Sequence, residues 1–332
     1  MYTKKYYSFS MTFRWSRKPF LVGWLYAMFA VLVHIFMHYN YGAEIYLPWQ
    51  PVSVLGIAVA FYLGFKNSAS YDRTWEARKI WGAIVNNSRS FTASITAFVK
   101  GQDAAIIHKE FIYRHVAWLT ALRYQLRLAR NWEHVEDRLN YLFSPTVCKE
   151  YFDGFENSVQ GFISHDELEF IKSKSNMATH LLHKQVKRLE ELHAQGMIDG
   201  FKLLEIKQLL NSFYDEQGKC ERIKNFPFPR QYASTTLWIT WIFAILLPWS
   251  MLNIISDLPI HYIWLNIPLT ALIIWVFFLM ERIGDYSENP FEGSYNDVPI
   301  TSIARGIEID IREMIGDDNI PGPIVPEKGF LL

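Results

Sequence analysis

Long apolar stretches alternate with amphipathic ones along the chain, and this alternation predicts an all-α membrane protein. Four stretches are candidates for the bilayer: residues 20–39, 52–65, 235–255 and 261–280. A hydrocarbon core about 30 Å thick needs about 20 helical residues, so three of these stretches are long enough to cross it. The stretch 52–65 is shorter, which suits a helix whose end faces water or protein.

Between the second and third apolar stretches the pattern changes. Apolar residues recur at intervals of three and four with charges between them, which predicts amphipathic helices. Two prolines in residues 225–230 end this block, and one more helix is expected near 299–315. The helices of the block are expected to break near Gly101, at Ser144–Pro145, from Gly154 to Ser164, from Gly196 to Gly200, and at Gly218.

These patterns divide the chain into five parts. We expect an N-terminal cytosolic or interfacial segment (1–18), transmembrane helices 1 and 2 (19–66), a cytosolic helical region (67–230), transmembrane helices 3 and 4 (231–282), and a C-terminal cytosolic tail that wraps the helical region (283–332).

The distribution of charge predicts the topology. The 332 residues include 33 basic and 33 acidic ones, and a net charge of zero argues against a nucleic-acid partner. The loops 40–50 and 256–261 contain no Lys or Arg, whereas residues 66–230 are rich in both. Positively charged segments stay on the cytoplasmic side. We therefore expect a multi-pass protein of the inner (plasma) membrane with both termini in the cytoplasm.

Side chains that carry catalysis or hold metals are sparse, so we expect neither an enzyme nor a cofactor. Cys148 and Cys220 lack metal-site spacing. His34 and His38 are spaced i, i+4 near Glu44, which leaves a membrane metalloenzyme as one alternative, although polar histidines at the membrane interface explain the pair better. A non-conducting scaffold in the bilayer is another alternative.

The stretch 52–65 carries the most informative spacing. On a helix, Ile57, Phe61 and Phe65 fall on one stripe. Such a stripe is explained either by ordinary helix packing or by the wall of a pore. A hydrophobic constriction can gate a pore by dewetting, but one helix cannot enclose a water path, so the pore hypothesis needs a closed ring of subunits.

Small residues repeat at the same spacing on a neighbouring stripe. Gly56, Ala60 and Gly64 are four apart, and small residues at this interval let a neighbouring helix approach closely in a bilayer. We expect this stripe to be a helix-packing surface.

Several motifs together resemble the bestrophin family, specifically its bacterial members. The similarity covers nearly the whole chain in the right order and is carried by VLGIAVAFYLGF at 54–65, YDRTWEARKIWG at 71–82, NPFE at 289–292 with the following NDVPI, and GIEIDI at 306–311.

The resemblance implies a fold and a set of site residues. Bestrophins have four membrane spans and a large helical cytosolic region, and they assemble as homopentamers around one axial pore. Their second span lines a narrow apolar neck, and its positions match Ile57, Phe61 and Phe65 here. A second, cytosolic aperture is matched by Phe201, with Ile206 as the alternative.

The resemblance also bears on the ion. Phenylalanines in the neck, as at positions 61 and 65, are similar to those of anion-selective members, so a channel for chloride or other small anions is expected. A monovalent-cation (sodium) channel of the same fold is the alternative, because some bacterial members conduct cations. Calcium-activated members carry consecutive acids after NPF, whereas FEGSYND has only Glu292 and Asp297, a departure from the calcium-binding pattern.

Overall fold

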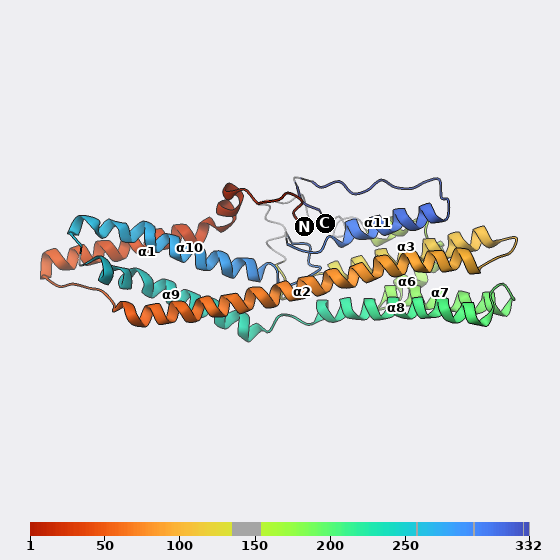
Figure 1. The fold of residues 1–332 in the computed structure, drawn as a ribbon, viewed down its shortest axis with the longest axis horizontal. Coiled ribbons are helices and arrows are strands. Elements are labelled where there is room, and N and C mark those ends of the chain that lie inside the picture. The colour runs from red at the N-terminus through yellow and green to blue at the C-terminus, as the bar shows by residue number, and fades with distance from the viewer. Residues whose placement is uncertain (135–153, 257, 295, 328, 332) are drawn as a thin grey trace. The chain divides into compact units, whose positions relative to one another are not determined.

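The computed structural model describes residues 1–134, 154–256, 258–294, 296–327 and 329–331 (Figure 1). Across these residues the regular elements are helices, and extended pairing is limited to isolated bridges. The all-α prediction is therefore confirmed. The chain forms two compact units: we call residues 4–72 and 228–288 the span unit, and residues 1–3, 73–227 and 289–332 the bundle unit.

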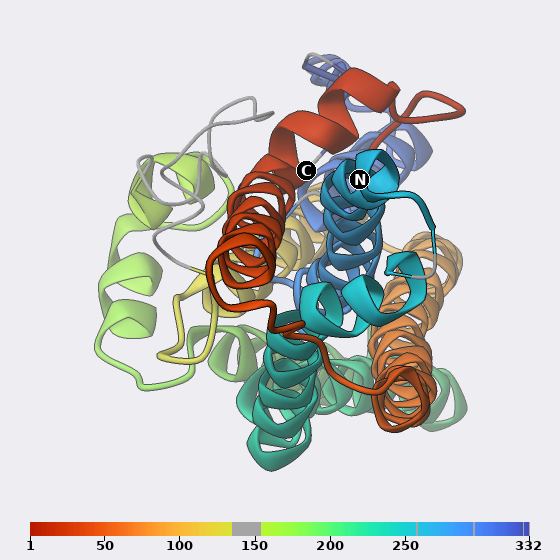
Figure 2. The same ribbon diagram turned by 90° about the vertical axis from the view of Figure 1, so that its left-hand side faces the viewer.

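The span unit contains the apolar helices. They are α1 (Phe9–Tyr41), the first part of α2 (Trp49–Phe98), α9 (Arg230–Ile255), and α10 (Asn266–Asp285) preceded by the 3-10 helix η2 (Ile260–Leu265). Among the residues that the structure describes, four helical segments are long and apolar enough to cross a membrane, as predicted. In Figure 2 the red α1 and the blue α10 lie side by side.

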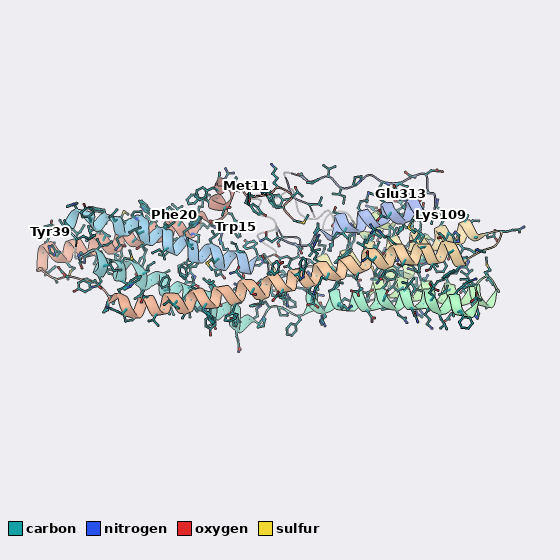
Figure 3. All side chains as sticks on the ribbon, viewed as in Figure 1. Met11, Trp15, Phe20, Tyr39, Lys109 and Glu313 are labelled. Carbon is teal, nitrogen blue, oxygen red and sulfur yellow. The ribbon has the colours of Figure 1, made fainter. Side chains whose placement is uncertain are left out.

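Helix α1 begins at Phe9, eleven residues before the predicted span 20–39, and is therefore longer than that span. The Ser8 side chain accepts a hydrogen bond from the backbone amide of Met11 and so caps the first turn. Phe20 and Tyr39 mark the predicted span along this helix (Figure 3). Arg282 of α10 donates to the carbonyl oxygen of Trp15, which ties the early part of α1 to α10.

The bundle unit holds the amphipathic helices. They are α2 from residue 73 onwards, α3 (Ala104–Arg127), α5 (Phe155–Val159), α6 (His165–Lys172), α7 (Met177–Ala194), α8 (Gly200–Asn225) and α11 (Ile300–Met314). Lys109 on α3 and Glu313 on α11 are labelled in Figure 3. The core of this unit contains an aromatic cluster: Phe91, Trp118 and Phe213 are buried around His115, and Phe111 packs against Phe91.

The predicted helix breaks are confirmed near Gly101 and from Gly196 to Gly200. The predicted break from Gly154 to Ser164 is confirmed only in part, because the short helix α5 occupies residues 155–159 within it. Gly218, in contrast, lies inside α8, which runs unbroken over 26 residues. An interior glycine costs a helix only about 1 kcal/mol, and the buried face of α8 continues on both sides of it. Ser144, Pro145 and Cys148 lie outside the described residues.

Candidate functional site

One face of α2 packs inside the span unit and the opposite face does not. The buried positions recur every three or four residues and are Val52, Gly56, Val59, Leu63, Lys66 and Ser70. Ile57, Phe61 and Phe65 lie on the other side, with exposed fractions of 71%, 65% and 52%. The three predicted neck residues therefore share a face that no other part of the described chain covers.

The two phenylalanines on this open face touch each other. The rings of Phe61 and Phe65 are edge-to-face, with centroids 4.5 Å apart and planes at 89°. In this geometry the hydrogen-bearing edge of one ring points at the face of the other. With Ile57 one turn earlier, the side chains form a continuous apolar strip about two turns long.

Of the three small residues on the predicted packing stripe of α2, only Gly56 meets another helix of the described chain. A Cβ atom on Gly56 would lie only 2.8 Å from the Phe243 ring of α9, so this glycine permits a close helix contact. A Cβ on Gly64 would meet nothing within 4 Å, and Ala60 is exposed. Each four-residue step turns a helix by about 400°, so the stripe drifts about 40° per step and leaves the buried face after Gly56.

The two residues matched to the cytosolic aperture differ in their surroundings. Phe201 is 89% exposed in the first turn of α8. The Asp199 carboxylate caps this helix by accepting from the amides of Lys202 and Phe201, and it also pairs with the Lys202 ammonium at 3.0 Å. The bond from the Lys202 amide, followed by the Lys202 ammonium, holds the pKa of Asp199 below its usual value. Ile206, one and a half turns later, is fully buried in the core of the bundle unit.

The acidic loop after α10 is folded around one carboxylate. Asp297 accepts hydrogen bonds from the amides of Phe291 (2.8 Å) and Gly293 (2.6 Å), and from the buried guanidinium of Arg127 (2.7 Å). Phe291 has a left-handed backbone with φ of 73°, a strained conformation for a bulky residue. The buried Glu292 faces His134, with its Oε1 3.3 Å from Nδ1. Protein donors thus surround the two acids that the motif retains.

The histidines of α1 have a structural role in the described chain. The ring of His34 is buried, and its Nδ1 lies 2.9 Å from the carbonyl oxygen of Ile45. The His38 ring stacks on it with a centroid distance of 6.5 Å. Among the described residues no group of three His, Cys, Asp or Glu side chains is placed to hold a metal ion.

The bundle unit also has an open cleft of about 530 Å³, lined by α3 and the loop before α6. Its charged walls pair with each other: Arg114 donates to Glu167 (2.7 Å) and to Glu110 (3.1 Å). Burial alone would lower the pKa of Arg114, but these two carboxylates raise it above its usual value. Because the charges are already paired, the cleft presents no strong recognition group for a ligand.

Sequence reasoning missed the ion pair next to the open face. Lys66 directly follows Phe65, yet it is 1% exposed and donates to Glu281 of α10 at 2.8 Å. The only signal for this pair in the sequence is that a basic residue, Lys66, follows the apolar stretch 52–65 and an acidic residue, Glu281, follows the apolar stretch 261–280. Spacing along one helix cannot reveal a partner 215 residues away.

The chain is similar to a family model, to relatives from several bacteria and to a solved structure. The family model described as "Bacterial/Fungal Bestrophin protein" matches residues 20–313. A voltage-dependent anion channel-forming protein of Ralstonia nicotianae is 27% identical, with 97% of this chain and 95% of the relative covered. A protein of Escherichia coli with the same description is 26% identical, with 86% of each covered. The crystal structure of a bacterial bestrophin homologue from Klebsiella pneumoniae has a similar fold: the TM-score is 0.75 at 22% identity, and the match covers 91% of this chain and 98% of that one.

Proposed function

Because the chain belongs to the bacterial and fungal bestrophin family, we propose that it is a membrane channel that passively conducts chloride or other small anions through a pore lined by α2. The relatives from Ralstonia nicotianae and Escherichia coli, both described as anion channel-forming, support this ion class and a non-enzymatic function.

One observation carries the proposal: Ile57, Phe61 and Phe65 lie together on a face of α2 that the protomer leaves open. Lipid is one way to cover an apolar face, and a narrow pore is another. The aromatic edges carry partial positive charge, so a ring of them can meet an anion without a fixed charge. A constriction of this kind conducts when it is wetted and closes by dewetting.

The pore requires several copies of the chain. We propose a homopentamer in which five α2 helices surround the axis and form the hydrophobic neck. Phe201, which is 89% exposed, would supply the cytosolic aperture. Ile206 is a poor candidate for that role because it is fully buried in the protomer. A closed ring is the usual arrangement when one surface must be repeated around a central path.

The charge pattern sets the proposed orientation. Loops 40–50 and 256–261 lack Lys and Arg, so they would face away from the cytoplasm. The region 67–230, the tail 283–332 and both termini would then be cytoplasmic, and the channel would lie in the inner membrane of a bacterial cell.

The test is ion selectivity of the purified protein in planar bilayers. With a tenfold KCl gradient, an ideal anion channel reverses at the chloride equilibrium potential, about 59 mV from zero. Reversal at the potassium equilibrium potential, which has the opposite sign, would refute the anion channel and support a cation channel of the same fold. Absence of current from correctly assembled protein would leave the scaffold hypothesis. The mass of the detergent-solubilised complex tests the pentamer.

A further inference from the structure

The ion pair between α2 and α10 lies directly beside the open face of α2. Consecutive residues on a helix point about 100° apart, so when Phe65 faces outward the next side chain can turn inward. Lys66 does so, and its side chain is almost completely buried in the span unit. A charged group inside an apolar unit is costly unless it has a partner.

Two acids of α10 supply that partner. The Lys66 Nζ lies 2.8 Å from Oε1 of Glu281 and 3.6 Å from Oδ1 of Asp285, which are one helical turn apart. The Glu281 side chain is itself nearly buried, whereas Asp285 is about one-third exposed. The Lys66 ammonium therefore lies over one turn of α10 and is held there by ion pairs with two carboxylates.

Two neighbouring features fix the same contact. The Asn67 side chain donates to the carbonyl oxygen of Met280 at 3.0 Å, and to that of Leu63 in its own helix at 2.8 Å. A Cβ on Gly284 would lie 3.3 Å from both Lys66 and Asn67. The helices can approach this closely because position 284 has no side chain.

A contact of this kind determines the rotation of α2 about its own axis. Apolar side chains pack acceptably at several rotations, because the hydrophobic effect has no direction. Turning α2 by one residue position would withdraw Lys66 from Glu281 and leave the acid buried without its counter-charge, which is strongly unfavourable. The same turn would move Phe65 off the open face.

We propose that Lys66 is a positioning residue for conduction: its ion pair with Glu281, supported by Asn67 and Gly284, holds α2 at the rotation that keeps Ile57, Phe61 and Phe65 facing the permeation path. This role rests on the proposed function, because the rotation of α2 affects ion flow only if α2 lines the pore.

The test measures helix rotation and current on the same protein. Single substitutions Phe61→Cys and Leu63→Cys are made in a chain carrying Cys148→Ser, with the buried Cys220 left in place. A water-soluble thiol reagent is applied to the assembled protein in lipid nanodiscs. The open position 61 is expected to react, and the buried position 63 is not.

The Lys66→Met variant should lose this difference between positions 61 and 63, and it should also lose the wild-type unitary conductance. Combining Lys66→Glu with Glu281→Lys restores the opposite charges in exchanged places and should restore both readouts. The matched control is Arg89→Met, which removes an exposed ion pair between α2 and Asp310 and should change neither.

Each other outcome has a definite meaning. If Lys66→Met assembles and keeps both the labelling difference and the parental conductance, the positioning role is wrong while the channel function stands. If Lys66→Met fails to assemble, the variant that combines Lys66→Glu with Glu281→Lys decides. The same labelling at positions 61 and 63 as in the parent protein supports the positioning role, and altered labelling or failed assembly overturns it. If the parent protein shows neither current nor labelling at position 61, the proposed function fails and the positioning role fails with it.

Discussion

Acid should destabilise the bundle unit through one buried histidine. His115 on α3 is fully buried, and its Nε2 lies 2.9 Å from the Ser88 hydroxyl. The rings of Phe91, Trp118 and Phe213 surround it at centroid distances of 5.3, 5.0 and 4.6 Å. Burial in this aromatic core lowers the pKa of His115 from 6.5 to about 3, because an imidazolium has lost its hydration there.

The sign and size of the effect follow from proton linkage. The folded pKa lies below the unfolded one, so His115 contributes its full stability above about pH 6.5 and loses it as the pH falls toward about 3. Each pH unit in this window is worth about 1.4 kcal/mol. Between pH 6.5 and pH 5.0 the unfolding free energy should therefore fall by about 2 kcal/mol, which lowers the melting temperature by about 4–8 °C for a unit of this size.

The assay is thermal unfolding in detergent, followed by tryptophan fluorescence at a series of pH values. Other groups also titrate in this range, so the measured quantity is the difference between the wild type and His115→Gln, which keeps a neutral polar side chain beside Ser88. The variant should start less stable at pH 7.5 but show a shallower loss toward pH 5.0. Equal pH dependence in both proteins would show that His115 does not stay neutral in the folded state.

Four further substitutions test other parts of the structure. Gly56→Ala should lower the unfolding free energy by about 1–3 kcal/mol, because the new methyl group overlaps the Phe243 ring of α9. Gly64→Ala should be neutral or stabilising in the same thermal unfolding assay, because the space around Gly64 is open. Equal effects of the two substitutions would contradict the assignment of Gly56 to the buried face of α2 and of Gly64 to its open face. Phe61→Ala should raise unitary conductance in bilayers if Phe61 lines the proposed pore. It should change stability by less than about 0.5 kcal/mol, because the ring is 65% exposed in the described chain. An unchanged conductance in properly assembled protein would argue that the ring lies away from the ion path. Asp297→Asn should cost about 3–5 kcal/mol, because it removes the buried carboxylate charge that lies 2.7 Å from the Arg127 guanidinium. The cost is measured as a drop in melting temperature, and a melting temperature equal to wild type would mean that this pair contributes little.

The sequence predicted the helices well because their signal is local. Runs of apolar residues identify membrane helices by composition alone, and the prolines between Asn225 and Arg230 mark the junction of α8 and α9. Gly218 was misread because the cost of one glycine is smaller than the packing of a long buried helix face.

The candidate site was only partly predictable for a different reason. The spacing of Ile57, Phe61 and Phe65 is visible in the sequence, but whether that stripe is covered depends on the other helices. The partners of Lys66 and Asp297 are more distant still: 215 residues separate Lys66 from Glu281, and 170 separate Arg127 from Asp297. Pairings over such distances are decided by the tertiary fold and leave no periodic trace.

The uninterrupted length of α2 has a consequence for how this chain can change. The helix contains 50 residues without a break, and within the span unit its buried ridge runs from Val52 to Ser70. Inserting one residue near position 60 would turn Leu63, Lys66 and Ser70 by about 100° with respect to Val52 and Gly56. An insertion of seven residues would turn them by only about 20°. Length variation is therefore tolerable in the loops, whereas within α2 we expect it only in multiples of two helical turns.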